Sequence, residues 1–323
     1  MKNHRFNRQI LKELDMLSET NNYRSLLGLL VDYLFIGASV YIVLVNWYFY
    51  PLAVLLIGTR QRAFVTLLHD AGHGVLFKNT WLNDFVGKYL TGYLIFLGFD
   101  DYIKSHVVHH HNHIGNEDKD PDLRFYNHFG LYEDLDKKAF IKKHLLKPML
   151  FGNAFIYAKA LFNDRLGYVK EGSREAIIMI VYWLFIIGVF ALNGWLLYLI
   201  LLWFVPFFII FPWQGWFIGI SEHFLLIKNP DEIDKSWNRF SHPLEAFFSS
   251  IHNENYHLTH HLRPDIPYWN LKKAHEIMMK DEKYRDLNIN MGGIFISSNK
   301  NPTFWNRIHE FLDDRELKRT SLN

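Results

Sequence analysis

The sequence predicts an all-α integral membrane protein with four transmembrane helices, arranged as two hairpins, and a helical cap on the cytoplasmic side. Half of the 323 residues are apolar and 17% are aromatic, and two long apolar stretches are each divided by a turn. Lysine and arginine are missing from both turns and abundant elsewhere. Membrane proteins place aromatic residues at the lipid–water boundary and basic residues on the cytoplasmic side.

The first hairpin is predicted at about 26–68. Residues 26–58 are apolar, with Asp32 as the only charge, and are too long for one span of roughly 20 residues. The uncharged sequence NWYFYP, which begins at Asn46, supplies a turn. The second helix is apolar only as far as Gly58, so we expect it to continue beyond the membrane into the sequence HDAGH.

The second hairpin is predicted at 176–222. Two apolar runs flank Asn193-Gly194, which is a strong turn signal. Pro206 and Pro212 are expected to kink the last helix, as membrane helices tolerate where neighbours satisfy the freed carbonyls. The shorter apolar segment 89–99 is better suited to a re-entrant or interfacial element than to a span.

The distribution of charge predicts the orientation. Because neither membrane turn carries Lys or Arg, both termini and the regions 69–175 and 223–323 are expected to be cytoplasmic. Residues 137–150, KKAFIKKHLLKPML, alternate basic and apolar faces at helical spacing. This segment is either an interfacial helix or an ordinary amphipathic surface helix.

Histidine is the most informative residue type: the chain has 18 histidines and no cysteine. In HDAGH two histidines are four residues apart, and in HVVHH and HLTHH three occur at i, i+3 and i+4, so each set leaves one face of a helix. GISEHF adds a single histidine at the end of the last apolar run. The histidines singled out are His69, His73, His106, His109, His110, His223, His257, His260 and His261.

Metal binding is the usual reason for a fold to concentrate so many imidazoles, because protonated imidazoles would repel one another. Under the predicted topology all nine lie on the same side of the membrane. Nine imidazoles exceed what one ion can bind, so two ions are indicated. Imidazole suits zinc, copper, nickel and iron alike, and the ligand type does not choose among them.

These motifs resemble the membrane fatty-acid desaturase superfamily, which also includes lipid hydroxylases. The resemblance covers roughly 61–271 and includes HDAGH, HVVHHHNHIG with the DPD at 120–122, SEHF and NYHLTHHLRPDIPYWNL. It implies one desaturase-like membrane domain over 1–323, with a di-iron centre held by the nine histidines. His111, His113 and His252 do not align with the ligand positions of the superfamily and are treated as bystanders or as partners of the ligands. His128 and His275 are assigned to the surface.

Four further residues are candidates to hold the ligands. A metal-bound histidine usually donates its other N–H to a carboxylate or carbonyl. Asp70, Glu222, Asn253 and Glu254 each lie within four residues of a proposed ligand. No catalytic residue is predicted beyond the metal centre.

The resemblance implies an oxygen-dependent oxidoreductase that desaturates an acyl or alkyl chain of a lipid or lipid-like metabolite, with O2 as co-substrate. The HxxHHxN pattern of the second box and LRPDIPYWNL after the third favour desaturation over hydroxylation of an apolar chain, which is the alternative. With no cysteine for an iron–sulfur cluster and no Gly-rich dinucleotide motif, electrons are expected from a separate protein, either ferredoxin or a b-type cytochrome with its reductase. No nucleic-acid partner is expected.

Two other classes of protein account for the motifs less well. A membrane zinc hydrolase could use HDAGH as a variant of the H-E-x-x-H motif, but that motif needs Glu where this chain has Asp70, and both HxxHH boxes would be unexplained. A histidine-rich metal carrier or sensor would place its histidines along a membrane path rather than on one side.

Overall fold

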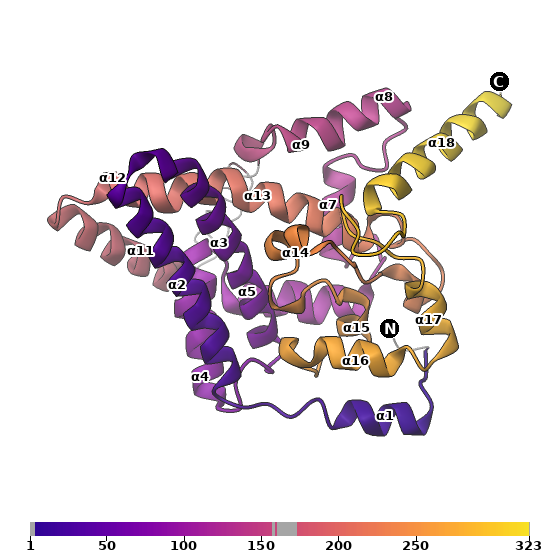
Figure 1. Cartoon of the computed structure of the whole chain (residues 1–323), viewed down its shortest axis with the longest axis horizontal. Helices are drawn as coiled ribbons and strands as arrows, with labels where there is room; N and C mark the ends of the chain where they lie inside the picture. The colour runs from indigo at the N-terminus through magenta and orange to yellow at the C-terminus, as the bar shows by residue number, and fades with distance from the viewer. Residues whose placement is uncertain (1–3, 157–158, 160–172, 323) are drawn as a thin grey trace. The chain divides into compact units, whose positions relative to one another are not determined.

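The fold is all-α, as predicted. The computed structural model describes residues 4–156, 159 and 173–322, in which the regular elements are helices, apart from an isolated β-bridge between Ser241 and Ser297 (Figure 1). Within these residues four helices are long and apolar enough to cross a membrane: Arg24–Val45, Trp47–Gly72, Arg174–Leu192 and Leu196–Phe224. They agree with the two predicted hairpins. The part of the predicted cytoplasmic region at 157–158 and 160–172 lies outside the described residues.

The chain divides into two compact units, which are described separately. Unit 1 comprises Met1–Glu19, Lys104–Leu150 and Trp216–Asn323, and unit 2 comprises Thr20–Ile103 and Phe151–Gly215. Unit 2 contains most of the spanning helices and the first histidine box. Unit 1 contains the second and third boxes and His223.

The helices of unit 2 are α2 (Arg24–Val45), η1 (Trp47–Phe49), α3 (Tyr50–Gly72), α4 (Thr80–Phe85), η2 (Val86–Gly92), η3 (Tyr93–Ile95), α5 (Phe99–Tyr102), α11 (Arg174–Leu192), α12 (Leu196–Leu199), η6 (Ile200–Phe204) and α13 (Val205–Gly219), whose last residues belong to unit 1.

The first hairpin turns on a polar cap. Asn46 ends α2, and its side-chain oxygen accepts a hydrogen bond from the backbone N–H of Tyr48 at 2.9 Å. Pro51 lies in the first turn of α3, where its missing N–H costs no helical hydrogen bond. The helix then runs without interruption to Gly72, which confirms the predicted extension past Gly58 into the first histidine box.

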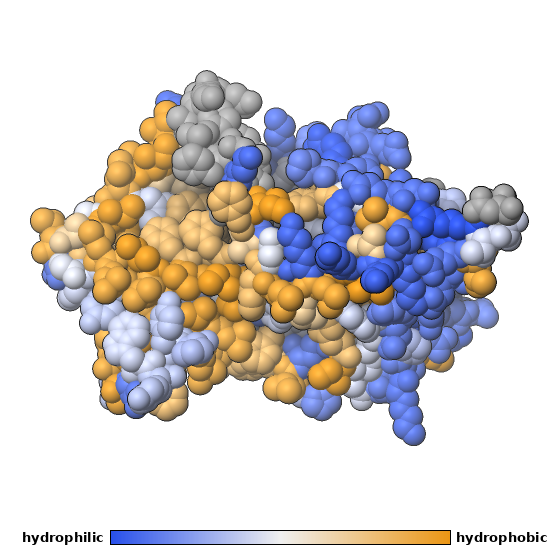
Figure 2. All heavy atoms as spheres, turned by 90° about the horizontal axis from the view of Figure 1, so that it is seen from above, coloured by the Kyte–Doolittle hydropathy of each residue, from blue (hydrophilic) through white to orange (hydrophobic). Residues whose placement is uncertain are grey.

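The outer surface of the spanning helices is apolar. Only 22% of the apolar stretch of α2, and the same share of α11, is buried, and side chains such as Leu34 and Phe185 are largely exposed. Figure 2 shows hydrophobic (orange) atoms gathered over these helices. Apolar surface of this extent is expected to face lipid.

Several polar side chains of unit 2 are buried between the helices and form ion pairs or hydrogen bonds there. Arg60 of α3 lies 3.2 Å from Asp32 of α2, so the one acidic group in the first apolar stretch is neutralised inside the helix pair. Gln61 donates to the carbonyl of Trp203 at 2.9 Å, and Gln214 donates to the hydroxyl of Thr59 at the same distance. These bonds join α3 to the last spanning helix, in an apolar environment where an unpaired polar group would be costly.

The last spanning helix carries a π turn. The turn η6 lies directly before Pro206, and Pro212 lies inside α13. Helices bend at π turns and at prolines. The segment 89–99 consists of short π and 3-10 turns, so it does not form a long helix. It is anchored to α11 by the Glu175 carboxylate, which accepts the backbone N–H groups of Phe99 at 2.7 Å and Asp100 at 2.9 Å.

The helices of unit 1 are α1 (Arg8–Asp15), η4 (Ile103–His110, whose first residue belongs to unit 2), α6 (His111–His113), α7 (Pro121–His128), α8 (Lys137–Phe140), η5 (Ile141–Leu146), α9 (Lys147–Met149), η7 (Ile220–Phe224), η8 (Glu232–Lys235), α14 (Pro243–Ser249), η9 (Ile251–Asn253), α15 (His257–Leu262), η10 (Tyr268–Asn270), α16 (Leu271–Met278), α17 (Glu282–Asn288) and α18 (Phe304–Leu322).

A buried polar cluster positions α15, the helix of the third box. The side-chain oxygen of Asn238 accepts the backbone N–H of Thr259 at 3.2 Å, and its amide donates to the hydroxyl of Tyr284 and to Asn288, both at 2.8 Å. Thr259 lies between the histidines of the box and is also 2.6 Å from the Tyr284 hydroxyl. These hydrogen bonds therefore connect the third box to α17.

The N-terminal helix holds the segment that follows the third box. Arg263, directly after α15, pairs with Asp15 at the end of α1 at 3.0 Å and with Asp265. Ser18 donates to the same Asp265 carboxylate at 2.6 Å. α1 also packs against α16. Residues near the beginning of the chain therefore hold the segment that follows the third box in place.

The basic segment 137–150 is helical from Lys137 to Met149 through α8, η5 and α9. Phe140 and Leu145 are buried, whereas Lys138 and Lys142 are exposed, as an amphipathic helix requires. Its place at a membrane surface stays a prediction.

The assignment of His275 to the surface is wrong. Its side chain is buried in α16, with Nδ1 2.8 Å from the hydroxyl of Tyr284 and 3.3 Å from the amide of Asn238. Burial lowers the pKa of His275 to about 4. His128, by contrast, is exposed, as predicted.

The neutral state of His275 predicts a pH-dependent stability. An unfolded histidine binds a proton below about pH 6.5, whereas folded His275 does so only near pH 4, so the free energy of unfolding should fall by up to about 3 kcal/mol between these values. Replacing His275 by Gln should reduce the difference between the melting temperatures at pH 7 and pH 5. Thermal unfolding in detergent measures this, with His128→Gln as the control that keeps the wild-type difference.

Candidate metal centre

The histidine boxes lie at helix ends or in irregular turns. His69 is in the last turn of α3 and His73 is the residue that ends it, with their ring centroids 4.8 Å apart. His223 lies in the π turn η7, at the end of the last spanning helix. The second box occupies the π turn η4 and the start of α6, and the third box occupies α15.

Four imidazoles of unit 1 converge on one point. We call this set the tetra-histidine group: His110, His223, His257 and His261. The Nε2 atom of His257 lies 2.7 Å from that of His223 and 3.1 Å from that of His261, and the Nε2 atom of His110 lies 3.3 Å from that of His261. The group joins three segments that are distant in the sequence.

The hydrogen bonds of the outward Nδ1 atoms determine whether the inward Nε2 atoms carry a proton or a lone pair. Nδ1 of His223 is 2.9 Å from the carbonyl of Lys235, and a carbonyl can only accept, so Nδ1 carries the proton. Nδ1 of His110 is 2.9 Å from the carboxylate of Asp120. In a neutral imidazole the other nitrogen then holds a lone pair. Both Nε2 atoms therefore present lone pairs to the centre of the group.

A metal ion fits this arrangement. Two nitrogens bound at about 2.1 Å from one ion, at tetrahedral or octahedral angles, lie about 3.0–3.4 Å apart, close to the spacing of these Nε2 atoms. Without an ion, inward lone pairs would face one another in a buried space at a considerable cost.

Electrostatics around the group agree with its role as a ligand set. Burial and the neighbouring imidazoles of His111, His257, His223 and His110 hold the pKa of His261 well below its ordinary value. Burial acts against a charge on His110 as well, but the carboxylates of Asp122 and Asp120 outweigh it and raise its pKa. Such a carboxylate makes the imidazole a stronger donor to metal.

Three more imidazoles of unit 1 form a second set, the tri-histidine group: His106, His111 and His260. Nε2 of His111 lies 3.2 Å from Nε2 of His106 and 3.1 Å from Nε2 of His260. These distances again match nitrogens that share one ion.

His111 belongs to this group, and His109 belongs to neither group among the described residues. The cause is the π turn η4. In a π turn the backbone bonds run from i to i+5 rather than i+4, so His111 returns to the side of His106. Nδ1 of His109 is buried without a hydrogen-bond partner in the described part of the chain.

The chain is similar to known proteins. Residues 46–293 match the family described as fatty acid desaturase. The chain is 36% identical to dihydrorhizobitoxine desaturase of Bradyrhizobium elkanii, across 90% of this chain and 85% of that protein. It is 26% identical to sn-1 oleoyl-lipid 12-desaturase of Anabaena variabilis, across 73% and 70%, and to sn-1 acyl-lipid omega-3 desaturase (ferredoxin) of Nostoc sp. (strain 36), across 80% and 76%.

The chain belongs to the fatty acid desaturase family.

Membership of the desaturase family confirms the predicted multi-pass membrane enzyme and the predicted desaturation of an alkyl or acyl chain. The two histidine groups fit the di-iron site of such an enzyme. Both HxxHH boxes, which a zinc hydrolase would leave unexplained, lie inside the matched residues.

Two of the predicted partners lie beside ligand candidates. Asp70 is 3.2 Å from Nδ1 of His69, and Glu222 is 3.7 Å from Nδ1 of His257. The Glu222 carboxylate is itself 3.2 Å from Arg239, which is almost completely buried. Asn253 donates to the carbonyl of Tyr268 at 3.0 Å, and its role, like that of Glu254, stays a prediction.

Asp120 is the partner that sequence reasoning missed. Its buried carboxylate accepts from Nδ1 of His110, from the backbone N–H of Gly115 at 2.6 Å and from that of Asp122 at 3.0 Å. Burial acts to raise the pKa of Asp120, but these hydrogen bonds outweigh it and lower the pKa. The signal was present as Asp-Pro at 120–121, a usual start of a helix, directly after the second box.

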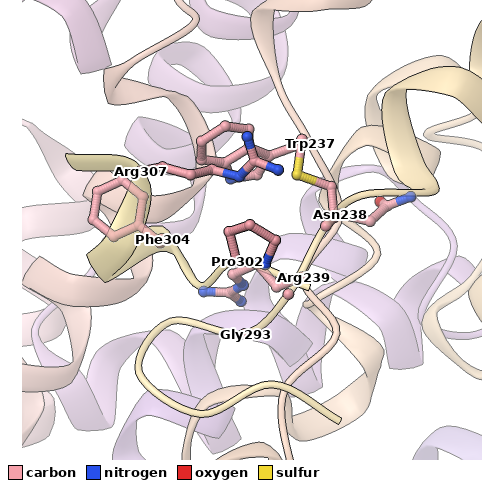
Figure 3. Close-up of a pocket in the computed structure, with 9 residues that line it drawn as sticks. Trp237, Asn238, Arg239, Gly293, Pro302, Phe304 and Arg307 are labelled. Carbon is pink, nitrogen blue, oxygen red and sulfur yellow. The ribbon is translucent and has the colours of Figure 1, made fainter. Parts of the chain in front are cut away.

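A separate cavity in unit 1 lies behind Arg239. Trp237, Asn238, Phe304 and Arg307 line it as well (Figure 3). Its volume of about 10 Å³ has room for a single water molecule and none for an alkyl chain.

The two possible ligand sets of the second box, one with His109 and one with His111, predict different effects of substitution on bound iron. Replacing His111 by Ala should lower the iron bound per chain as much as replacing His257, His260 or His261, because each change removes an inward nitrogen. Replacing His109 by Ala should leave more iron bound. Elemental analysis of the purified protein measures this, with His128→Ala as the control.

Full iron in His111→Ala together with its loss in His109→Ala would show that the second box binds metal with the α-helical spacing of His106, His109 and His110.

Proposed function

We propose that this chain is an oxygen-dependent di-iron desaturase that introduces a double bond into the aliphatic part of a lipid or lipid-like metabolite. The observation that carries the proposal is the convergence of four Nε2 atoms, each on a separate imidazole, in the tetra-histidine group. One ion would be held by this group. The choice of iron rests on the family, because imidazole alone does not select it.

The second ion would be held by the tri-histidine group together with His69 and His73. Three imidazoles would leave an ion short of ligands, and the first box has two histidines on one face at the end of α3. The contribution of His69 and His73 rests on their spacing and on the family resemblance. In this set His111 takes the place that the sequence reasoning gave to His109.

When bound, the two ions would supply the oxidant that removes two hydrogen atoms from the substrate, at the expense of O2 and two electrons. The chain itself has to hold the imidazoles in one protonation state, and the carbonyl of Lys235 and the carboxylate of Asp120 do so for His223 and His110. It must also position one C–H bond and exclude water.

The electrons would come from a separate protein, because the chain has no cysteine for an iron–sulfur cluster. A relative that is 26% identical is named as a ferredoxin enzyme, which supports ferredoxin as the first donor to test. A b-type cytochrome with its reductase is the other.

The substrate panel should include both a small metabolite and acyl lipids. The relative at 36% identity is named for dihydrorhizobitoxine, and those at 26% are named for oleoyl or acyl lipids. The proposal is therefore an aliphatic segment carried on a polar head, without restriction to a glycerolipid.

The reaction outcome is tested with labelled dioxygen. Reconstituted enzyme with a ferredoxin system should convert a substrate of this panel to a product two mass units lighter that contains no oxygen label. The loss of two hydrogens without oxygen transfer is the signature of desaturation. Incorporation of label into the organic product would identify a hydroxylase instead.

The orientation predicts where an introduced cysteine can be labelled. Because the membrane turns lack basic residues, Tyr48→Cys should react with an impermeant thiol reagent from outside the cell, and Lys119→Cys should react only after permeabilisation. Tyr48 is 92% exposed, and the chain has no native cysteine to interfere. Labelling of Tyr48→Cys from the cytoplasmic side would contradict the topology.

A further inference from the structure

The outward faces of two ligand candidates are connected by a frame of hydrogen bonds. Nδ1 of His223 donates to the carbonyl of Lys235 at 2.9 Å, and the ammonium of the same Lys235 donates to the carbonyl of Ile114 at 2.9 Å. The next residue, Gly115, donates its N–H to Asp120, and Asp120 accepts Nδ1–H of His110. We call Ile114, Gly115, Asp120 and Lys235 the frame.

Asp120 has a single orientation available in this frame. One carboxylate oxygen accepts from His110 and from the N–H of Asp122, and the other accepts from Gly115. The residue also caps α7, whose next residue is Pro121. Asp120 is completely buried, so its carboxylate makes these contacts out of reach of water.

The turn at Gly115 admits no side chain. Its φ of +78° lies in the left-handed region, and a Cβ atom there would be 2.3 Å from the carbonyl oxygen of Ile227 and 2.9 Å from the Lys235 ammonium. The backbone can therefore approach both Lys235 and Asp120. The frame depends on this close approach.

We propose that Asp120 is a positioning residue that holds His110 as an Nε2 metal donor, and that Lys235 secures the turn on which Asp120 depends. The inference rests on the proposed function, because it concerns the ion of the tetra-histidine group. The tri-histidine group makes none of the frame contacts described above. Loss of the Asp120 carboxylate should therefore release one ion and leave the other.

Replacing Asp120 by Asn tests this role. Asparagine caps helices as well as aspartate does, so α7 keeps its start when the amide oxygen faces His110 and the N–H of Asp122. Its amide has only one oxygen, however. If that oxygen faces His110, the NH2 group opposes the N–H of Gly115, and if it faces Gly115, the NH2 group opposes Nδ1–H of His110. The second arrangement favours the tautomer with a proton on Nε2, which cannot bind metal.

The experiment compares the full-length protein in detergent as wild type, Asp120→Asn, Lys235→Met and Asp122→Asn. Asp122→Asn is the graded comparison, because its carboxylate also acts on His110 but is 3.6 Å from Nδ1 and 42% exposed, whereas Asp120 is buried and hydrogen-bonded to it. Iron per chain, its rate of removal by a chelator and the ⁵⁷Fe Mössbauer spectrum are measured. These measurements report metal binding directly, so a loss of activity that has another cause would not change them.

For Asp120→Asn we expect a 10–100-fold weaker affinity for one of two ions, so that iron falls from two to one per chain and one Mössbauer component is lost. Lys235→Met should have a smaller effect of the same kind, since the backbone carbonyl that holds His223 remains. Asp122→Asn should weaken the binding of this ion less than Asp120→Asn does, because the Asp122 carboxylate makes no short hydrogen bond to His110 and is partly exposed.

Wild-type iron content and chelator resistance in Asp120→Asn would overturn the inference. Equal loss of both ions would do so as well, because it would indicate a general structural role. The variant His257→Ala distinguishes a failure of the positioning role of Asp120 from a failure of the proposed function. If His257→Ala loses iron and Asp120→Asn does not, only the positioning role fails, and if His257→Ala keeps both ions, the metal centre itself is wrong.

Discussion

The tetra-histidine group depends on one constraint at His223 and His110: an imidazole that offers its Nε2 lone pair inward carries its proton on Nδ1, and that N–H points outward. In a buried site an unsatisfied N–H is costly, so each ligand needs a fixed acceptor behind it. His223 has a backbone carbonyl and His110 has a carboxylate. Buried carboxylates need neutralising in turn, and Arg239 does so for Glu222 while it also donates to the hydroxyl of Ser221 at 3.1 Å.

Irregular helices determine where the imidazoles of unit 1 lie. The turns η4 and η7 are both π turns and both carry ligand candidates, which agrees with the frequent occurrence of such turns at functional sites. A π turn moves the following residue around the helix. In η4 this places His106, His110 and His111 so that the first and last join one group and the middle one joins the other. A regular helix would not divide the box between two groups in this way.

The spans and the helical spacing of the third box could be predicted from the sequence, whereas the positions of side chains where the backbone leaves its regular period could not. Apolar length and uncharged turns depend only on composition, and α15 is a regular helix, so its i, i+3, i+4 spacing holds. The position of His111, rather than His109, beside His106 and His260 follows from a π turn that no residue pattern announces. His275 was different, because Leu271, Ala274 and Met278 lie on the same helical face and could have indicated its burial.

The position of the ligands relative to the spans also bears on the substrate. His73 of unit 2 lies just after the last turn of a helix long enough to span, and His223 of unit 1 lies in the last turn of another, so each position suits a ligand candidate near the membrane surface. Transfer of an alkyl chain from water into an apolar site contributes about 0.8 kcal/mol per methylene, whereas transfer from lipid contributes almost nothing. A bilayer lipid would therefore have to be bound and placed in register chiefly through its polar head. A water-soluble metabolite could be bound through its tail. The two substrate classes would therefore require different contacts from the protein around the same metal centre.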